Sequence, residues 1–206
     1  PEDRPLLVEG AKKINILYKD QIFLAESTHF YPVDLEIRHT FKNDLDVRFR
    51  AIKPSDEDQM RRLFYRFSDK AIYYRYFSPI KTMPHEKMQE YVNVDYRDTL
   101  SIVALVGDPG KQTIIAEARF AKHQSKPFVE VAFVVDEDYQ GSGIATYLYQ
   151  LLAKLAKDRG AQGMTADVLA SNRAMLKIFE KGPFQVQAKM EEGIYELTID
   201  LTRTKN

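Results

Sequence analysis

The stretch Gln140-Gly141-Ser142-Gly143 places two glycines and two polar residues directly before an apolar segment with helical spacing. Backbone amides at the start of a helix have no intrahelical partner, and the helix dipole favours negative charge there. Glycines let an anion approach the backbone closely because they carry no Cβ. The pattern therefore predicts a site for a phosphate-containing ligand.

Three interpretations of this loop differ in what they bind. A Walker A loop is excluded because no lysine follows Gly143. A dinucleotide loop fits poorly, because residues 136–140 separate Val135 from the first glycine and Thr146 stands where the third is needed. Asp167 is the acid that such a loop would use on the next strand. In the third interpretation the glycines only form a strand-to-helix corner, and the loop alone does not exclude this.

Residues 140–145, Gln-Gly-Ser-Gly-Ile-Ala, match the Q/R-x-x-G-x-G/A signature of the GNAT family of N-acetyltransferases. The resemblance extends from Asp46 to Leu201, and residues 75–88 resemble acetyltransferase domains fused to larger bacterial acyl-CoA proteins, including protein lysine acetyltransferases. It implies an α/β fold with a central mixed, mostly antiparallel sheet, splayed between its fourth and fifth strands, and with helices on both faces. It also implies acetyl-CoA as the co-substrate and no metal.

The resemblance further implies which residues hold coenzyme A. Backbone amides of the loop would cradle its pyrophosphate, from Gln140, Gly141, Ser142, Gly143, Ile144 and Ala145. Main-chain groups of Val134 and Val135 would bind the pantetheine arm, and one amide would polarise the acetyl carbonyl. Asn172 would contact the cofactor, although asparagine here also suits a helix N-cap. Phe179 stands where the family often has a tyrosine that protonates the leaving thiolate, so its ring is expected to pack against the pantetheine or the core.

Glu130 is the candidate catalytic base. It is a lone acid in the apolar strand 128–135 and matches the position of the family's frequent fourth-strand glutamate. A base is valuable because an amine must be neutral to attack a thioester, and an ordinary lysine is protonated at neutral pH. Burial among apolar neighbours is expected to make Glu130 a stronger proton acceptor. The competing interpretation is a carboxylate on a solvated face, or one paired with Arg119 of the next strand.

Hydrophobic periodicity predicts the elements that position these residues. Strands are expected at 46–52, 99–108, 112–121, 128–135 and 164–169, followed by a closing antiparallel pair. Helices are expected from Pro54, after Pro84, from Ile144 to Gly160 and over 172–182. Ser55 and Asp58 form a capping pattern for the first helix. This order describes a mostly antiparallel sheet and not a doubly wound dinucleotide fold.

Composition excludes several other functions. Acidic and basic residues balance at 30 each, so no bulk field attracts nucleic acid or an anionic membrane. Residues 61–77 mix arginines with aromatics, but Leu63, Phe64 and Phe67 favour a core stripe with a solvated basic face. The acids at 136–138 are expected to be solvated.

No apolar run approaches the length of about 20 residues that a membrane span needs. The absence of cysteine fits a reducing cytoplasm, and the four histidines lack metal-ligand spacing.

Residues 1–45 differ from the rest of the chain in their pattern of apolar and polar residues, and they lie outside the resemblance. Short strand-like runs at 14–18, 21–25 and 34–39 predict an N-terminal arm, or the remnant of an upstream domain such as a fused acyl-CoA enzyme. Residues 46–206 are expected to form the acetyltransferase domain. The predicted reaction transfers acetyl from acetyl-CoA to a primary amine, with a protein lysine favoured, in a direct ternary complex because no cysteine can carry the acetyl group. The alternative is a non-catalytic acyl-CoA-sensing domain that regulates a fused enzyme.

Overall fold

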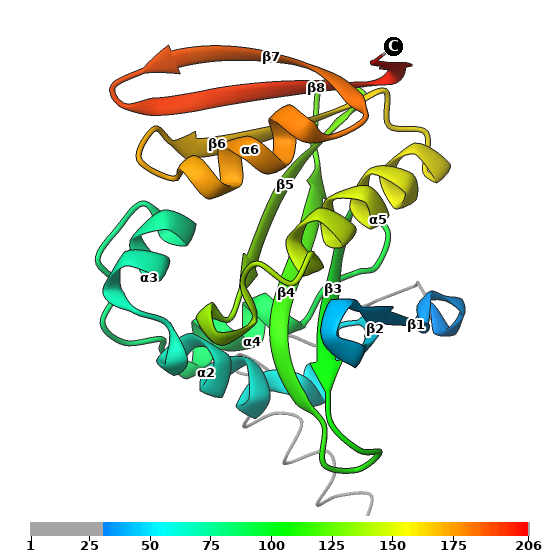
Figure 1. Ribbon diagram of the computed structural model, residues 1–206, viewed down its shortest axis with the longest axis vertical. Coiled ribbons are helices and arrows are strands. Elements are labelled where there is room, and N and C mark those ends of the chain that lie inside the picture. Colours follow the sequence, from blue (N-terminus) through cyan, green and yellow to red (C-terminus); the bar gives the residue numbers. More distant parts are fainter. Residues whose placement is uncertain (1–30, 206) are drawn as a thin grey trace, which may run out of the picture.

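Eight strands form one sheet in the order β1-β2-β3-β4-β5-β6-β8-β7 in the computed structural model, which describes residues 31–205 (Figure 1). The strands are β1 (Ile37–Phe41), β2 (Leu45–Ala51), β3 (Thr99–Val106), β4 (Thr113–Lys122), β5 (Phe128–Val135), β6 (Gly163–Leu169), β7 (Phe184–Glu191) and β8 (Ile194–Thr204). Every neighbouring pair is antiparallel except β5 with β6. The predicted mixed, mostly antiparallel sheet is confirmed. The strand-like runs at 14–18 and 21–25 lie outside the described residues.

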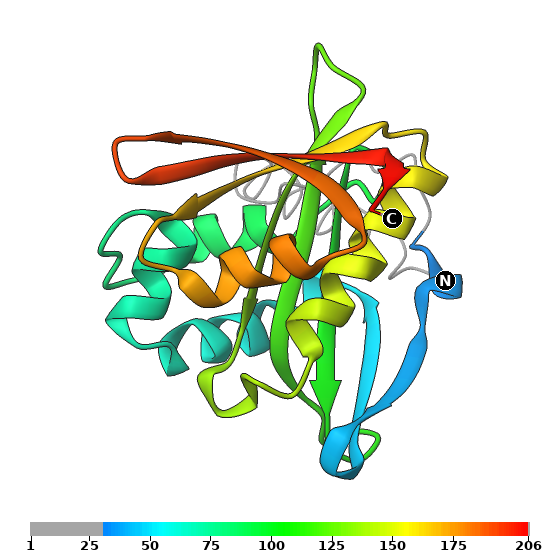
Figure 2. The same cartoon turned by 45° about the horizontal axis from the view of Figure 1, so that its top comes forward.

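Helices cover both faces of the sheet, as predicted (Figures 1 and 2). One face carries α2 (Glu57–Arg66), α3 (Asp69–Tyr76) and α4 (His85–Val92), and the other carries α5 (Ile144–Asp158) and α6 (Arg173–Lys181). Short 3₁₀ turns connect the elements, namely η1 (Val33–Leu35), η2 (Lys42–Asp44), η3 (Pro54–Asp56) and η4 (Glu137–Tyr139). Because side chains alternate along a strand, β4 and β5 supply residues to both layers.

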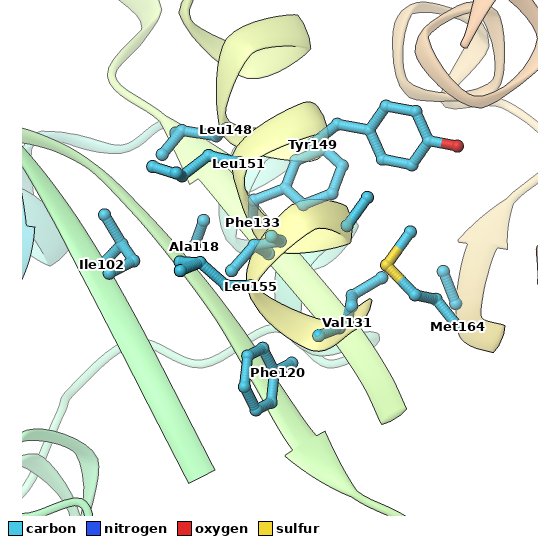
Figure 3. Close-up of a cluster of buried hydrophobic side chains, with 14 of the residues drawn as sticks. Ile102, Ala118, Phe120, Val131, Phe133, Leu148, Tyr149, Leu151, Leu155 and Met164 are labelled. Atoms are coloured by element: carbon cyan, nitrogen blue, oxygen red, sulfur yellow. The ribbon is translucent and has the colours of Figure 1, made fainter. Parts of the chain in front are cut away.

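The larger core lies between the sheet and α5 (Figure 3). Leu148 and Leu155 of α5 are buried and pack with Phe120 and Phe133 of the central strands. Burying a side chain of this kind contributes about 1.5–3 kcal/mol. This packing holds the start of α5 beside the end of β5, where the glycine loop lies.

The segment 61–77 forms two helices and not one stripe. α2 ends at Arg66, and the backbone of Phe67 is extended. Ser68 then begins α3, because its hydroxyl accepts a hydrogen bond from the Ala71 amide at 3.2 Å. The prediction that Phe67 continues the first helix is therefore wrong, although its side chain is buried.

The start of the first helix also differs from the sequence prediction. Asp56, and not Ser55, supplies the cap, and it does so for η3, the short turn that leads into α2: its carboxylate accepts the Lys53 amide at 2.8 Å. Asp56 makes no side-chain bond that caps α2 itself. Asp56 also receives two bonds from the Arg50 guanidinium, at 2.6 and 2.7 Å. Both side chains are buried, so the cap depends on a tertiary ion pair that local sequence does not reveal.

β5 and β6 separate after a short paired stretch. Their parallel register covers Phe128–Gly163, Val129–Met164 and Glu130–Thr165. Beyond Glu130 the two strands no longer pair, and β6 continues against β8 alone. This is the predicted splay. β1, which comes from the predicted arm, precedes the predicted first strand and pairs with β2.

Candidate active site

A cleft of about 920 Å³ fills the opening between β5 and β6. Its floor is β5 from Glu130 to Val135, and its far end is the loop that leads into α5. One wall is α6 with the loop before it, and the other wall is α3 (Figure 1). The cleft therefore uses elements from both helical layers.

The cleft brings together most of the residues singled out in the sequence. They are Glu130, Val134, Val135, Gln140, Gly141, Gly143, Ile144, Ala145, Asn172 and Phe179. Ser142 does not line it. The Ser142 hydroxyl donates to the Tyr139 carbonyl at 2.6 Å and so folds the loop back on η4.

The glycine loop has the conformation expected of an anion cradle. Gly141 and Gly143 have φ of +78° and +98°, which side chains with a Cβ rarely adopt. A Cβ at Gly141 would meet nothing within 4 Å, so the space beside this backbone is open. Within residues 31–205, no side chain caps the first turn of α5. Free amides beside open space fit the pyrophosphate of coenzyme A.

The prediction that the acids before the loop are solvated is wrong for Asp136, which is buried, and is confirmed for Glu137 and Asp138, which are exposed. Asp136 is 5% exposed and accepts a bond from Arg66 Nε at 2.6 Å. Glu137 accepts bonds from the amide and hydroxyl of Ser68, both at 2.8 Å. These contacts join the loop to α2 and α3. On the other side, the Gln140 side-chain amide donates to the Val135 carbonyl at 3.2 Å.

Glu130 lies at the vertex of the splay, because it is the last residue of β5 that pairs with β6. The side chain is exposed, so the expectation that Glu130 is buried is wrong. It makes no ion pair with any described residue, since Arg119 donates instead to Glu117 at 2.7 Å. The Glu130 carboxylate is thus open to a ligand in the cleft.

Asn172 and Phe179 hold α6 in place at the cleft wall. The Asn172 side chain accepts the Met175 amide at 3.2 Å, which is the N-cap that the sequence predicts. The Phe179 ring is 2% exposed and packs against Phe133 and Tyr149, with ring centroids 5.6 and 5.2 Å apart. Burial raises the pKa of Tyr149 to about 12, which keeps this neighbour of Phe179 protonated.

Sequence reasoning did not identify α3 as a wall of the site. Tyr74, Arg75 and Tyr76 of α3 line the cleft. The Tyr74 hydroxyl donates to the Ser171 carbonyl at 3.1 Å and so links α3 to the loop before α6. A local signal existed, because Ser68 followed by Asp69 is a favoured helix start.

A buried charged cluster lies on the face of the sheet that α3 and α4 cover. Glu117 of β4 is fully buried and accepts bonds from Ser101 at 2.6 Å, Arg119 at 2.7 Å and Tyr91 at 3.0 Å. Arg75 lies 3.8 Å from the same carboxylate. Burial alone would raise the pKa of Glu117, but the charges of Arg119 and Arg75 and the Ser101 bond outweigh it and hold this pKa below its usual value.

A splayed mixed sheet with an open glycine loop at the start of the following helix defines a coenzyme A-dependent acyltransferase fold. The family model for the Acetyltransferase (GNAT) family matches residues 61–182. The chain belongs to this family and is an N-acetyltransferase domain. The family uses acetyl-CoA.

Relatives and solved structures agree with this membership. The chain is 36% identical over 134 residues to Acetyltransferase Pat of Mycolicibacterium smegmatis, covering 64% of this chain and 39% of that protein. It is 27% identical over 129 residues to Acetyltransferase PA5475 of Pseudomonas aeruginosa, covering 63% and 69%. The GNAT domain of S. lividans PAT superimposes with a TM-score of 0.74 at 26% identity, over 83% of this chain and 99% of that one. The cAMP-binding acyltransferase from Mycobacterium smegmatis gives 0.56 at 26% identity, over 80% of this chain and 47% of that one.

Residues 31–205 contain no helix that is both long and apolar enough to cross a membrane. Over the same residues, no three His, Cys, Asp or Glu side chains are arranged to hold a metal ion. Of the four histidines, His29 lies outside this part.

Proposed function

We propose that the chain transfers the acetyl group of acetyl-CoA to a primary amine, with a lysine side chain of a protein as the acceptor, in a direct ternary complex. The position of Glu130 supports this function most directly. It is an unpaired carboxylate at the vertex of the splay, on the floor of a cleft that ends at the glycine loop. The two relatives named as acetyltransferases, from Mycolicibacterium smegmatis and Pseudomonas aeruginosa, support the same reaction class.

The loop residues would bind and orient the cofactor. Amides of residues 141–145 would meet the pyrophosphate, because the Gln140 amide already donates to the Glu137 carbonyl at 3.3 Å. Main-chain groups of Val135 would bind the pantetheine arm. Those of Val134 face β4 instead, because Asp136 N–H donates to the Ile115 carbonyl and hydrogen-bonded residues alternate along an antiparallel pair. Asn172 would contact the cofactor through its side-chain Nδ2, since its Oδ1 caps α6. Phe179 would give the arm an apolar wall. When bound, acetyl-CoA supplies the activated acyl carbon.

Glu130 would remove a proton from the acceptor ammonium, directly or through one water. The neutral amine would then form the new C–N bond at the acyl carbon, and the C–S bond would break. The nitrogen, positively charged after the attack, would release its second proton to solvent and become the neutral amide. Phe179 has no proton to give, so the departing thiolate would take one from solvent. The main-chain amide of Val135, which faces the open side of β5, would polarise the carbonyl as negative charge develops on its oxygen.

Substituting Glu130→Gln tests this function. A positioned general base contributes about 10²–10⁴-fold, so kcat for thiol release with a lysine peptide should fall at least 100-fold. The acetyl-CoA Kd, measured by calorimetry, should stay unchanged. Glu86→Gln is the matched control because Glu86 is an exposed glutamate of α4 that does not line the cleft. Wild-type rates in Glu130→Gln would remove this residue from the mechanism.

The second candidate function is a non-catalytic domain that senses acyl-CoA, and Phe179 favours it because the expected proton donor is missing. It predicts that acetyl-CoA binds and that no amine, including one on a partner domain, promotes thiol release. We further propose that residues 1–45 belong to an arm or to an upstream acyl-CoA enzyme domain, and that residues 46–206 form the acetyltransferase domain. The greater length of the relative Pat supports a longer parent protein.

A further inference from the structure

A second cavity of about 440 Å³ lies beside the cleft, and Tyr76 lines both. Its outer walls are largely apolar, formed by Ile80, Met83 and Pro84 from the segment between α3 and α4. Arg119 and Tyr91 of the buried cluster also line it. The second cavity therefore combines apolar walls with a guanidinium.

The buried cluster carries one more positive charge than negative charge. Arg75 and Arg119, whose side chains are 13% and 17% exposed, share the single carboxylate of Glu117. At the rim, Lys87 and Glu90 pair with each other at 2.8 Å and cancel. The Arg75 Nε–H group is buried and has no acceptor among the described residues. That donor lies away from the second cavity, which Arg75 does not line. Arg119 does line it, so an anion bound there would offset the excess positive charge of the cluster at Arg119.

The two tyrosines of the second cavity add donors and no negative charge. Burial is the main cause that raises the pKa of Tyr76 and of Tyr91, so both hydroxyls stay protonated. The Tyr91 hydroxyl already donates to Glu117 at 3.0 Å. Tyr76 lines both cavities, so its side chain stands in the wall between them, beside the hydroxyl of Tyr91.

The strand register places this cluster beside Glu130. Arg119 pairs with Ala132, and the next-but-one residue of β4, Ala121, pairs with Glu130. Directly opposed residues share one face of a sheet, so Arg119 and Glu130 lie on the same face, diagonally across two strands. Diagonal neighbours are roughly 7–8 Å apart. If the acceptor amine lies at Glu130, the substrate groups that are close to this amine would therefore lie within reach of Arg119.

We propose that the second cavity recognises a carboxylate close to the acceptor amine, so that the preferred acceptors are lysines with an Asp or Glu side chain nearby in the polypeptide. The inference rests on the proposed function and narrows its substrate class. Charge-assisted bonds from a guanidinium and a tyrosine would bind the carboxylate, and the apolar walls would shield these bonds from water.

A peptide series tests the preference. Lysine peptides with blocked termini carry Glu or Gln at one position from −3 to +3 relative to the lysine, and kcat/KM is measured at saturating acetyl-CoA. Wild-type protein should prefer Glu over Gln by about tenfold in at least one position, as a charge-assisted bond implies. A free α-carboxylate is tested separately, with lysine itself and with a peptide ending in an unblocked lysine.

Two variants locate the preference in the second cavity. Arg119→Met removes the guanidinium, and because it also leaves Glu117 buried with one partner fewer, its folding is checked by circular dichroism. Thr82→Trp fills the second cavity from an exposed lining position and disturbs no buried charge. In both variants the ratio of kcat/KM for the Glu peptide to kcat/KM for the Gln peptide should fall to about one. Thr113→Trp, at an exposed position of β4 outside both cavities, is the control and should keep the ratio.

The outcomes separate this inference from the proposed function. Equal rates for Glu and Gln peptides in active wild-type protein would overturn the carboxylate preference and leave the acetyltransferase intact. A preference that survives Thr82→Trp would also overturn it, because the second cavity would not be its source. A preference only for free α-carboxylates would overturn the assignment to a protein side chain. If no amine promotes thiol release, the proposed function itself fails and this inference fails with it.

Discussion

Gly141→Ala tests whether the loop binds the cofactor or only forms a corner. The structure offers a matched control, because Gly193 in the β7–β8 turn has nearly the same positive φ. The φ angles are +78° and +83°, and a Cβ at either position would meet nothing within 4 Å. The two alanine variants therefore carry the same strain in the protein without ligand. Only Gly141 lines the cleft.

The expected magnitudes follow from this match. An L-residue with positive φ costs about 1–2 kcal/mol, partly offset by a less flexible unfolded chain. Both variants should lose about 1 kcal/mol of unfolding free energy and about 2–4 °C in Tm. In Gly141→Ala the added Cβ would also hold a phosphate away from the backbone. Losing one charge-assisted hydrogen bond costs about 1.5–3 kcal/mol, which corresponds to roughly 10–150-fold weaker binding.

The assay is calorimetric titration of both variants with acetyl-CoA, together with their thermal unfolding without ligand. Gly193→Ala should bind acetyl-CoA as the wild type does, and Gly141→Ala should bind it at least tenfold more weakly. Equal destabilisation with unchanged acetyl-CoA affinity in both variants would refute the cradle. The glycines would then serve only the turn between η4 and α5.

Three further substitutions test contacts away from the loop. Asp56→Asn breaks the buried ion pair with Arg50, so the free energy of unfolding measured with urea should fall by about 3–5 kcal/mol. A fall of less than about 1 kcal/mol would contradict the energetic importance of this pair. Tyr74→Phe removes the hydrogen bond to Ser171 across the cleft, so acetyl-CoA should dissociate a few-fold faster in stopped-flow measurements. An unchanged dissociation rate would show that this bond does not retain the ligand. The pKa of Glu117 is lowered from 4.5, so its carboxylate stabilises the fold above that pH and the contribution is lost as pH falls further. Urea midpoints should thus drop more steeply below pH 4.5 in the wild type than in Glu117→Gln.

Much of the candidate site could be predicted because its parts are local in sequence. The glycine loop, the Asn172 cap and the order of strands follow from turn residues, capping residues and hydrophobic periodicity, each of which acts over a few neighbouring residues. The exposure of Glu130 could not be predicted in this way. Its strand reads as continuously apolar, yet it parts from β6 at that residue, and strand separation depends on partners distant in sequence.

The amino-acid sequence by itself determined the order of helices and strands along the chain, the position of the phosphate loop and the family resemblance, since periodicity and loop chemistry are local. The placement of β8 between β6 and β7 was decided by the tertiary structure. The tertiary structure alone decided that α3 forms a cleft wall and that Glu137 joins the loop to it. It also decided that Arg119 pairs with Glu117, leaving Glu130 open to the cleft. These outcomes depend on which side chains meet when β4, α3 and α4 pack together, because the partner of a buried charge is set by proximity in space and not by spacing along the chain.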